Sequence, residues 1–265
     1  MTDKIILGRY IPVDSPLHRL DARSKIVFVF GFILIVFLAN NVTTNVILFL
    51  FTIGTVVISN VPYKFLLNGL KPILIIILFT FLLHLFFTKE GDLVVEWGWI
   101  KIYEEGIRQG IFISLRFIYL ILITSLLTLT TSPITLTDGL ESLLNPLKKV
   151  KMPVHELALM MSISLRFIPT LMEETEKIMK AQTARGVEFS SGPIKERVKA
   201  IVPLLIPLFV SSFKRAEELA LAMEARGYKG GEGRTKYREL KWETRDHVLM
   251  MIFAGLTAIL WFLRS

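Results

Sequence analysis

The sequence contains no cysteine. This absence excludes disulfide bonds, thiolate metal sites and a cysteine nucleophile. The sequence also lacks the pattern G-x-x-x-x-G-K-[ST], in which backbone amides and a lysine hold nucleotide phosphates. The glycine-rich stretch at residues 227–234 has a different spacing and indicates a flexible loop. We therefore expect that the chain hydrolyses no ATP itself and binds no cofactor or resident metal.

Charged residues are scarce in five apolar segments, at residues 26–39, 45–59, 72–88, 111–131 and 247–263. Over its 265 residues the chain is 52% hydrophobic, with a mean hydropathy of +0.56. A bilayer core takes roughly 17–25 apolar helical residues, and the last three segments reach or nearly reach that length. The first two are shorter and depend on snorkelling flanks such as Lys25. The sequence predicts an all-α integral membrane protein with five transmembrane helices, give or take one.

The orientation follows from the distribution of lysine and arginine, which concentrate on the cytoplasmic side of membrane proteins. Residues 1–25 carry five of them, the loop at 60–71 carries two and no acid, and the loop at 89–106 is acidic. We therefore expect the N-terminus and residues 132–246 in the cytoplasm and the C-terminus outside. The net charge of +8 indicates attraction to anionic lipid headgroups of the bilayer rather than a nucleic-acid partner.

Three domains follow from these patterns: a membrane domain at 1–131, a cytoplasmic domain at 132–246 and a last span at 247–265. The cytoplasmic domain is expected to hold a short helix at 135–147 and two long helices, at 154–185 and 194–226, because prolines open or punctuate each one.

The apolar run at 201–213 lies inside the second long helix. It is short and contains two prolines, so it fits a buried or interfacial helix better than a sixth span. The apolar spacing that follows is helical and predicts a stripe that packs on the neighbouring long helix, made of Phe209, Phe213, Ala216, Ala220 and Met223.

Both long helical runs end in the same tripeptide, 41 residues apart. The two copies are Ala184-Arg185-Gly186 and Ala225-Arg226-Gly227. One interpretation is a helix cap, since glycine supplies a left-handed residue and arginine suits the helix dipole. The other is docking, since an arginine fork can bind a carboxylate in a bidentate manner. Two equivalent ends would then suit a dimeric partner, and the residues leave both interpretations open.

These paired endings, together with "SPLHRLDARSK" at residues 15–25, resemble the transmembrane T component of energy-coupling factor (ECF) transporters across the whole chain. The resemblance implies a scaffold in a prokaryotic cell membrane that joins two ABC-type ATPases to a small substrate-binding membrane subunit, the S component, for uptake of vitamins or metal ions. It implies that ATP and magnesium bind to the ATPases. The two long helices would be coupling helices whose Arg185 and Arg226 enter grooves of the ATPase pair, with Ala184, Gly186, Ala225 and Gly227 completing the motifs.

Two other classes of function are tested by what the apolar segments lack. An ion-coupled secondary transporter normally buries acids or histidines near the middle of the membrane, and these segments hold no Asp or Glu well inside, which counts against coupling to protons or sodium ions. A membrane enzyme acting alone would need a partner for His84, and none is obvious. We expect His84 to bond within the helix bundle and Arg116 to snorkel to the outer interface.

Overall fold

The computed structural model describes residues 10–97, 100–189, 193–230 and 239–264. The chain divides into two compact units, Met1–Leu143 with Glu239–Ser265, and Leu144–Arg238. The loop expected at 227–234 is described only as far as Gly230.

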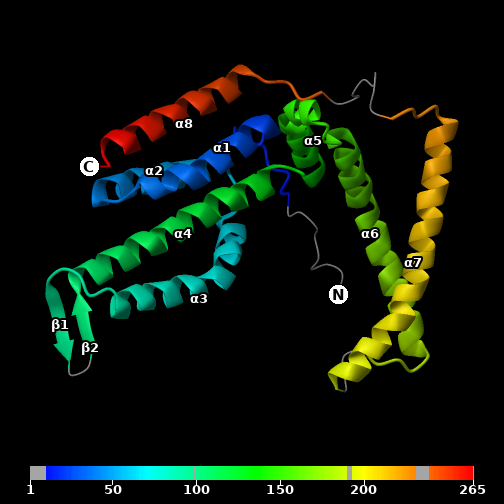
Figure 1. Ribbon diagram of the computed structural model, residues 1–265, viewed down its shortest axis with the longest axis horizontal. Helices are drawn as coiled ribbons and strands as arrows, with labels where there is room; N and C mark the ends of the chain where they lie inside the picture. The colour runs from blue at the N-terminus through cyan, green and yellow to red at the C-terminus, as the bar shows by residue number, and fades with distance from the viewer. Residues whose placement is uncertain (1–9, 98–99, 190–192, 231–238, 265) are drawn as a thin grey trace. The chain divides into compact units, whose positions relative to one another are not determined.

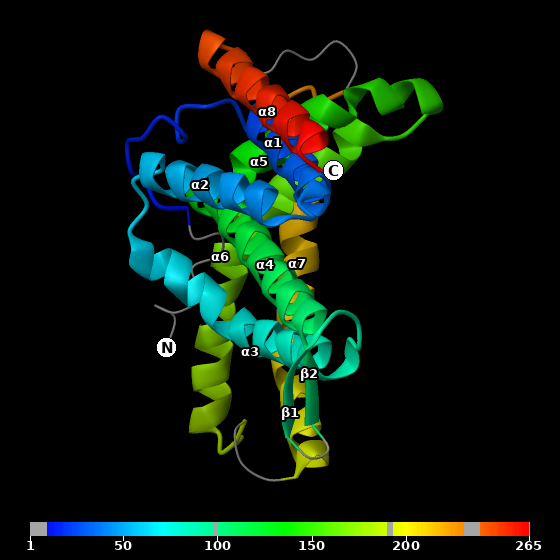
Figure 2. The ribbon, with the colours of Figure 1, turned by 90° about the vertical axis from the view of Figure 1, so that its left-hand side faces the viewer.

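The first unit is a bundle of helices with one short β-hairpin. Its helices are α1 (Ala22–Ile35), α2 (Val42–Ile58), α3 (Tyr63–Phe87), α4 (Glu104–Thr130), α5 (Pro133–Leu144) and α8 (Thr244–Phe262), with the 3₁₀ turn η2 (Val36–Leu38) after α1. The strands β1 (Leu93–Trp97) and β2 (Ile100–Tyr103) pair antiparallel between α3 and α4. Helix α4 packs against α1, α2 and α3, and α8 packs against α1. Figures 1 and 2 show this bundle from two sides.

Within the described residues, four helices are long and apolar enough to cross a membrane. They are α3, α4, α8 and α6 (Val154–Ala184), and α2 is a shorter apolar helix. The prediction of an all-α membrane protein is confirmed. The set of long apolar helices differs from the expected spans in two ways. The first two segments form helices of only 14 and 17 residues, and α6, which was expected in the cytoplasm, is also long and apolar enough to cross a membrane. Helix α6 is the least apolar of the four, at a mean hydropathy of 1.2 against 2.4 for α3.

The core of the first unit lies where α1, α2, α4 and α8 meet. Its largest buried side chains include Phe32, Leu48 and Tyr119, and the Tyr119 hydroxyl donates to the carbonyl of Asn45 at 3.1 Å. A Cβ at Gly31 would lie 2.5 Å from the tip of the Phe253 ring, so a larger residue there would displace that ring where α8 approaches α1. Many apolar side chains also face outward, as in helices that are apolar all round and span membranes.

Two polar side chains of the apolar helices bond within the bundle. Arg116 donates to the carbonyl of Ala39 at 3.2 Å, and its guanidinium lies 4.9 Å from the centre of the Phe37 ring. The protein therefore holds the end of Arg116 at the turn after η2. His84 makes a longer contact within the end of α3, with 3.4 Å between its Nδ1 and the hydroxyl of Thr88.

The second unit consists of the 3₁₀ turn η3 (Asn145–Val150), α6 and α7 (Ile194–Ala225). The predicted long helices at 154–185 and 194–226 are confirmed to within a residue at each end. The helix expected at 135–147 ends earlier, because α5 stops at Leu144 and the chain tightens into η3. Helices α6 and α7 run in opposite directions and cross (Figure 1).

The face of α7 that packs on α6 differs from the predicted stripe. Phe209 and Phe213 stay 62% and 68% exposed. At the crossing, Arg215 forms an ion pair with Glu174, whose other oxygen accepts a hydrogen bond from Ser211 at 3.0 Å. Arg215 and Ser211 thus contact α6 directly, while Phe209, Phe213 and Ala216 border an open groove beside Leu171 and Thr175 of α6.

Candidate functional site

Both Ala-Arg-Gly tripeptides end their helices with the same backbone geometry. Arg185 is the C-cap of α6 with φ −87°, and Arg226 is the C-cap of α7 with the same φ of −87°. The glycines that follow are left-handed, with φ 88° at Gly186 and 75° at Gly227. Such angles strain any residue that has a Cβ, so the backbone explains why glycine stands at both positions.

The hydrogen bonds at both ends form a Schellman motif, in which the last carbonyls of the helix accept from amides beyond it. At α6, the amide of Gly186 donates to Thr183 at 2.9 Å and that of Val187 donates to Gln182 at 3.0 Å. The equivalent bonds close α7 at 2.8 and 3.0 Å, from Gly227 to Glu224 and from Tyr228 to Met223. The cap interpretation of the tripeptides is therefore correct for the glycines.

The arginines are not explained by the cap. All six residues of the two tripeptides are exposed, and a Cβ built on either glycine meets nothing within 4 Å. Among the residues that the structure describes, nothing therefore covers the ends at Arg185 and Arg226. The C-terminal ends of α6 and α7 lie at opposite ends of the crossed pair (Figures 1 and 2), so a rigid helix pair presents two equivalent ends well separated from each other.

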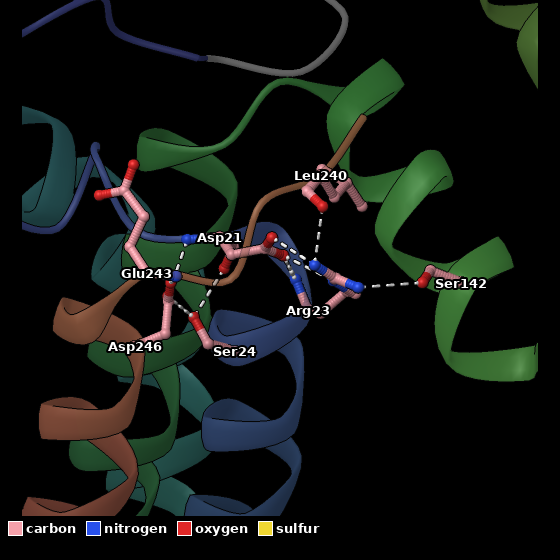
Figure 3. A network of polar contacts seen from close by, with 7 residues as sticks. All are labelled: Asp21, Arg23, Ser24, Ser142, Leu240, Glu243 and Asp246. Carbon is pink, nitrogen blue, oxygen red and sulfur yellow. Dashed lines mark hydrogen bonds and ion pairs between the residues drawn. The ribbon is translucent and has the colours of Figure 1, made fainter. Parts of the chain in front are cut away.

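A second polar cluster lies in the first unit, where α1 begins (Figure 3). Asp21 caps α1 and accepts from the amide of Arg23 at 2.8 Å and from its guanidinium at 2.9 and 3.1 Å. Arg23 also donates to the carbonyl of Leu240 at 3.0 Å and to the hydroxyl of Ser142 at 3.4 Å. The hydrogen bond from Arg23 to Asp21 raises the pKa of the guanidinium, which stays charged.

Asp246 joins the start of α8 to the start of α1 (Figure 3). It is 1% exposed and accepts from the amides of Asp21 and Glu243, both at 2.9 Å, and from the hydroxyl of Ser24 at 2.5 Å. Asp246 was not among the functional residues predicted from the sequence. The available signal was a capping box, an acid three residues after the N-cap Glu243.

The stretch at residues 15–25 folds around two further side chains. His18 accepts from or donates to Ser15 Oγ at 2.7 Å and contacts the Ile11 carbonyl at 3.0 Å, and burial lowers its pKa. Lys25 does not snorkel as expected: it is 6% exposed and donates to the Thr130 carbonyl at 3.1 Å and the Thr131 hydroxyl at 3.0 Å. The end of α4 offers acceptors that replace water, so the lysine turns inward.

In the part of the chain that the structure describes, no group of three or more His, Cys, Asp or Glu side chains could hold a metal ion. The polar clusters instead fix helix ends. The fold thus defines a class: a multi-pass, all-α membrane protein that carries a crossed pair of long helices with matching ends.

Comparison with known proteins narrows this class. The family model CbiQ, described as cobalt transport protein, matches residues 14–237. A protein of Bacillus subtilis is 67% identical over 265 residues, covering 100% of both chains. One of Exiguobacterium sibiricum is 61% identical over 261 residues, covering 98% of this chain and 99% of the relative, and one of Listeria innocua is 57% identical over 265 residues, covering 100% of both. All three are named energy-coupling factor transporter transmembrane protein EcfT.

The chain belongs to the CbiQ/EcfT family, and its role is in transport across a membrane. The resemblance seen in the paired tripeptides and in residues 15–25 is confirmed by these matches.

Proposed function

We propose that this chain is the transmembrane scaffold of an ATP-driven importer of the ECF type. It couples ATP hydrolysis by two ABC-type ATPase subunits to uptake of a vitamin or other micronutrient that a separate S component binds. The chain is itself non-catalytic, and ATP and magnesium bind to the ATPases. The N-terminus and residues 132–246 face the cytoplasm, where the ATPases are.

The observation that carries the proposal is the pair of matching helix ends. Helices α6 and α7 close with the same Schellman motif. Each exposes an arginine at its C-cap position. Because the ends lie at opposite ends of the crossed helices (Figure 1), each is suited to a different copy of one partner surface. Two ATPase subunits supply two such surfaces.

The crossing explains how movement at one end would reach the other. The ion pair between Arg215 and Glu174, with the hydrogen bond from Ser211, fastens the two helices near the middle of each. When an ATPase displaces Arg185, α6 then moves together with α7, because the two helices are joined at their crossing. In this role the small side chains of Ala184 and Ala225 let the walls of a groove on the ATPase approach the neighbouring arginine closely.

Substitution of the two arginines tests the proposal. Truncating one partner of a buried, hydrogen-bonded charge pair costs about 2–5 kcal/mol of binding free energy, whereas an arginine that only complements a helix dipole contributes under about 1 kcal/mol. Arg185→Ala or Arg226→Ala should weaken copurification of the ATPases or uncouple ATP hydrolysis from uptake, and the double variant should abolish uptake. Arg→Lys should restore function only in part, since a point charge lacks the planar fork.

Arg166→Ala is the matched control, because Arg166 is an exposed arginine of α6 outside the tripeptide. It should leave ATPase binding unchanged. If the double variant binds both ATPases and drives uptake at the original rate, the tripeptides are helix caps alone. If the purified chain transports a solute in liposomes without any ATPase, the scaffold proposal fails altogether.

A further inference from the structure

The first unit contains a cavity of about 390 Å³ whose wall is almost wholly apolar. It is bounded by the first turns of α1 and α8, the last turns of α2 and α4, and the segment before α1. Its volume lies in the ~300–1,000 Å³ range of small-molecule sites. Apolar contributors include Phe28, Phe51, Ile123 and Leu249.

Two cations, Lys25 and Arg245, are the only charged groups among the described residues that line the cavity. No described carboxylate lies within 4.0 Å of the Lys25 ammonium, which is bonded to neutral oxygens of His18, Thr130 and Thr131. Arg245 has only a long contact, 3.9 Å from its Nε to Glu243. Arg245, whose side chain is about half exposed, is therefore the cation at the cavity that still has donors for an anion. The Lys25 ammonium uses its three protons on neutral oxygens, and its charge is attracted by Asp246 and Asp21.

The carboxylates nearest to this charge are already engaged. Asp21 is bonded to Arg23, and Asp246 accepts from Ser24 and from two backbone amides. An additional anion beside Arg245 would therefore meet guanidinium donors that make only one long contact with a described carboxylate. A ligand with a hydrocarbon tail and a negatively charged end would match the apolar wall and the cationic edge of the cavity.

We infer that this cavity is a binding site for an anionic glycerophospholipid, with part of one acyl chain between α1, α2, α4 and α8 and the phosphate beside Arg245. The four helix turns that form it lie, by the predicted orientation, on the cytoplasmic side, where anionic lipids attract basic residues. An acyl chain gains little by leaving the bilayer for an apolar cavity, because lipid tails are equally apolar. The Arg245 guanidinium therefore sets the preference for an anionic headgroup.

The test measures bound lipid and so does not depend on the proposed coupling role. The full chain is purified in detergent and incubated with equal amounts of phosphatidylglycerol and phosphatidylcholine carrying the same acyl chains, and retained lipid is measured by native mass spectrometry. We expect one phosphatidylglycerol per chain, preferred over phosphatidylcholine. Arg245→Gln should weaken retention about fivefold, as expected for one basic residue near a membrane surface.

Gly54→Phe should abolish retention, because Gly54 lines the cavity and a Cβ there meets nothing within 4 Å, so the ring fills the space. Arg108→Gln is the matched control, since Arg108 lines a separate apolar groove near the start of α4. Unchanged retention in this control supports the site. Equal retention of the two lipids, equal loss in the Arg108 variant, full retention in Gly54→Phe, or displacement by inorganic phosphate would each overturn the inference.

Discussion

At the scale of single residues, glycine is required at two positions for the angle of the backbone rather than for space. Gly186 and Gly227 have φ of 88° and 75°, and both have room for a side chain. A left-handed residue costs roughly 1–2 kcal/mol when it carries a Cβ. The position of each neighbouring arginine depends on that turn, since the turn ends the helix directly after it.

Gly186→Ala or Gly227→Ala should therefore loosen the helix end without affecting the bundle. Hydrogen exchange at the amides of Val187 or Tyr228, which close the two Schellman motifs, should become roughly five- to thirtyfold faster, which corresponds to 1–2 kcal/mol. Asn in place of Ala should have a smaller effect, because asparagine tolerates the left-handed region. Gly54→Ala, in a right-handed helix interior, is the control and should not accelerate exchange at these amides. Unchanged exchange in both Ala variants would show that the glycines are not needed for the caps.

At the scale of elements, one carboxylate attaches the last helix to the first. Asp246 is nearly fully buried and accepts three hydrogen bonds, from Asp21, Ser24 and Glu243 (Figure 3). The Asp246 carboxylate therefore caps α8 and also accepts the hydrogen bond of the Asp21 amide, just before α1. Arg23 extends this cluster to α5 and to the segment before α8 through Ser142 and Leu240. The starts of α1 and α8 thus share one polar network.

Asp246→Ala should destabilise the bundle strongly. A buried donor left without an acceptor costs about 1–3 kcal/mol, and the substitution leaves the buried Asp21 amide without one, whereas the Ser24 hydroxyl can still donate to the Asp21 carbonyl. Loss of the cap of α8 adds about 1 kcal/mol. Thermal unfolding of the purified full chain should shift to clearly lower temperature, with a smaller shift for Asp246→Asn, which keeps one carbonyl oxygen. Asp14→Ala is the control, since its ion pair with Arg19 is exposed and such pairs contribute about 0–1 kcal/mol. Equal shifts for Asp246→Ala and Asp14→Ala would contradict the assigned role.

At the scale of the whole molecule, orientation in the membrane is a prediction from charge. The hairpin of β1 and β2 separates α3 from α4, two helices long enough to span, and the acids around it place it outside by the distribution of positive residues. Lys229 follows the end of α7 and belongs to the region expected in the cytoplasm. The two positions should therefore lie on opposite sides.

Asp92→Cys should be labelled by an impermeant maleimide added to intact cells, and Lys229→Cys only after permeabilisation. The chain has no native cysteine, so the unmodified protein is the control and should take no label. Labelling of Lys229→Cys from outside would reverse the orientation and separate the arginine ends from any cytoplasmic ATPase.

Local patterns were enough to predict much of this protein. Runs of apolar residues specify the membrane class because they reflect transfer into lipid, residue by residue. The bounds of α6 and α7 were predicted because proline opens each helix and glycine ends each one within a few residues. The tripeptides at Arg185 and Arg226 were found for the same reason. Their docking to ATPases is a prediction that the fold does not test.

Only the tertiary structure decided how distant segments meet. The bond from Asp21 to Asp246 joins residues 225 positions apart, and no local pattern specifies such a partner. The inward turn of Lys25 depends on acceptors at the end of α4, and the pairing of Arg215 with Glu174 joins residues of two different helices. The cavity above Lys25 exists only where four helix turns come together. Propensity, periodicity and caps act over a few residues, whereas a buried charge is placed by whichever acceptors the folded chain brings to it.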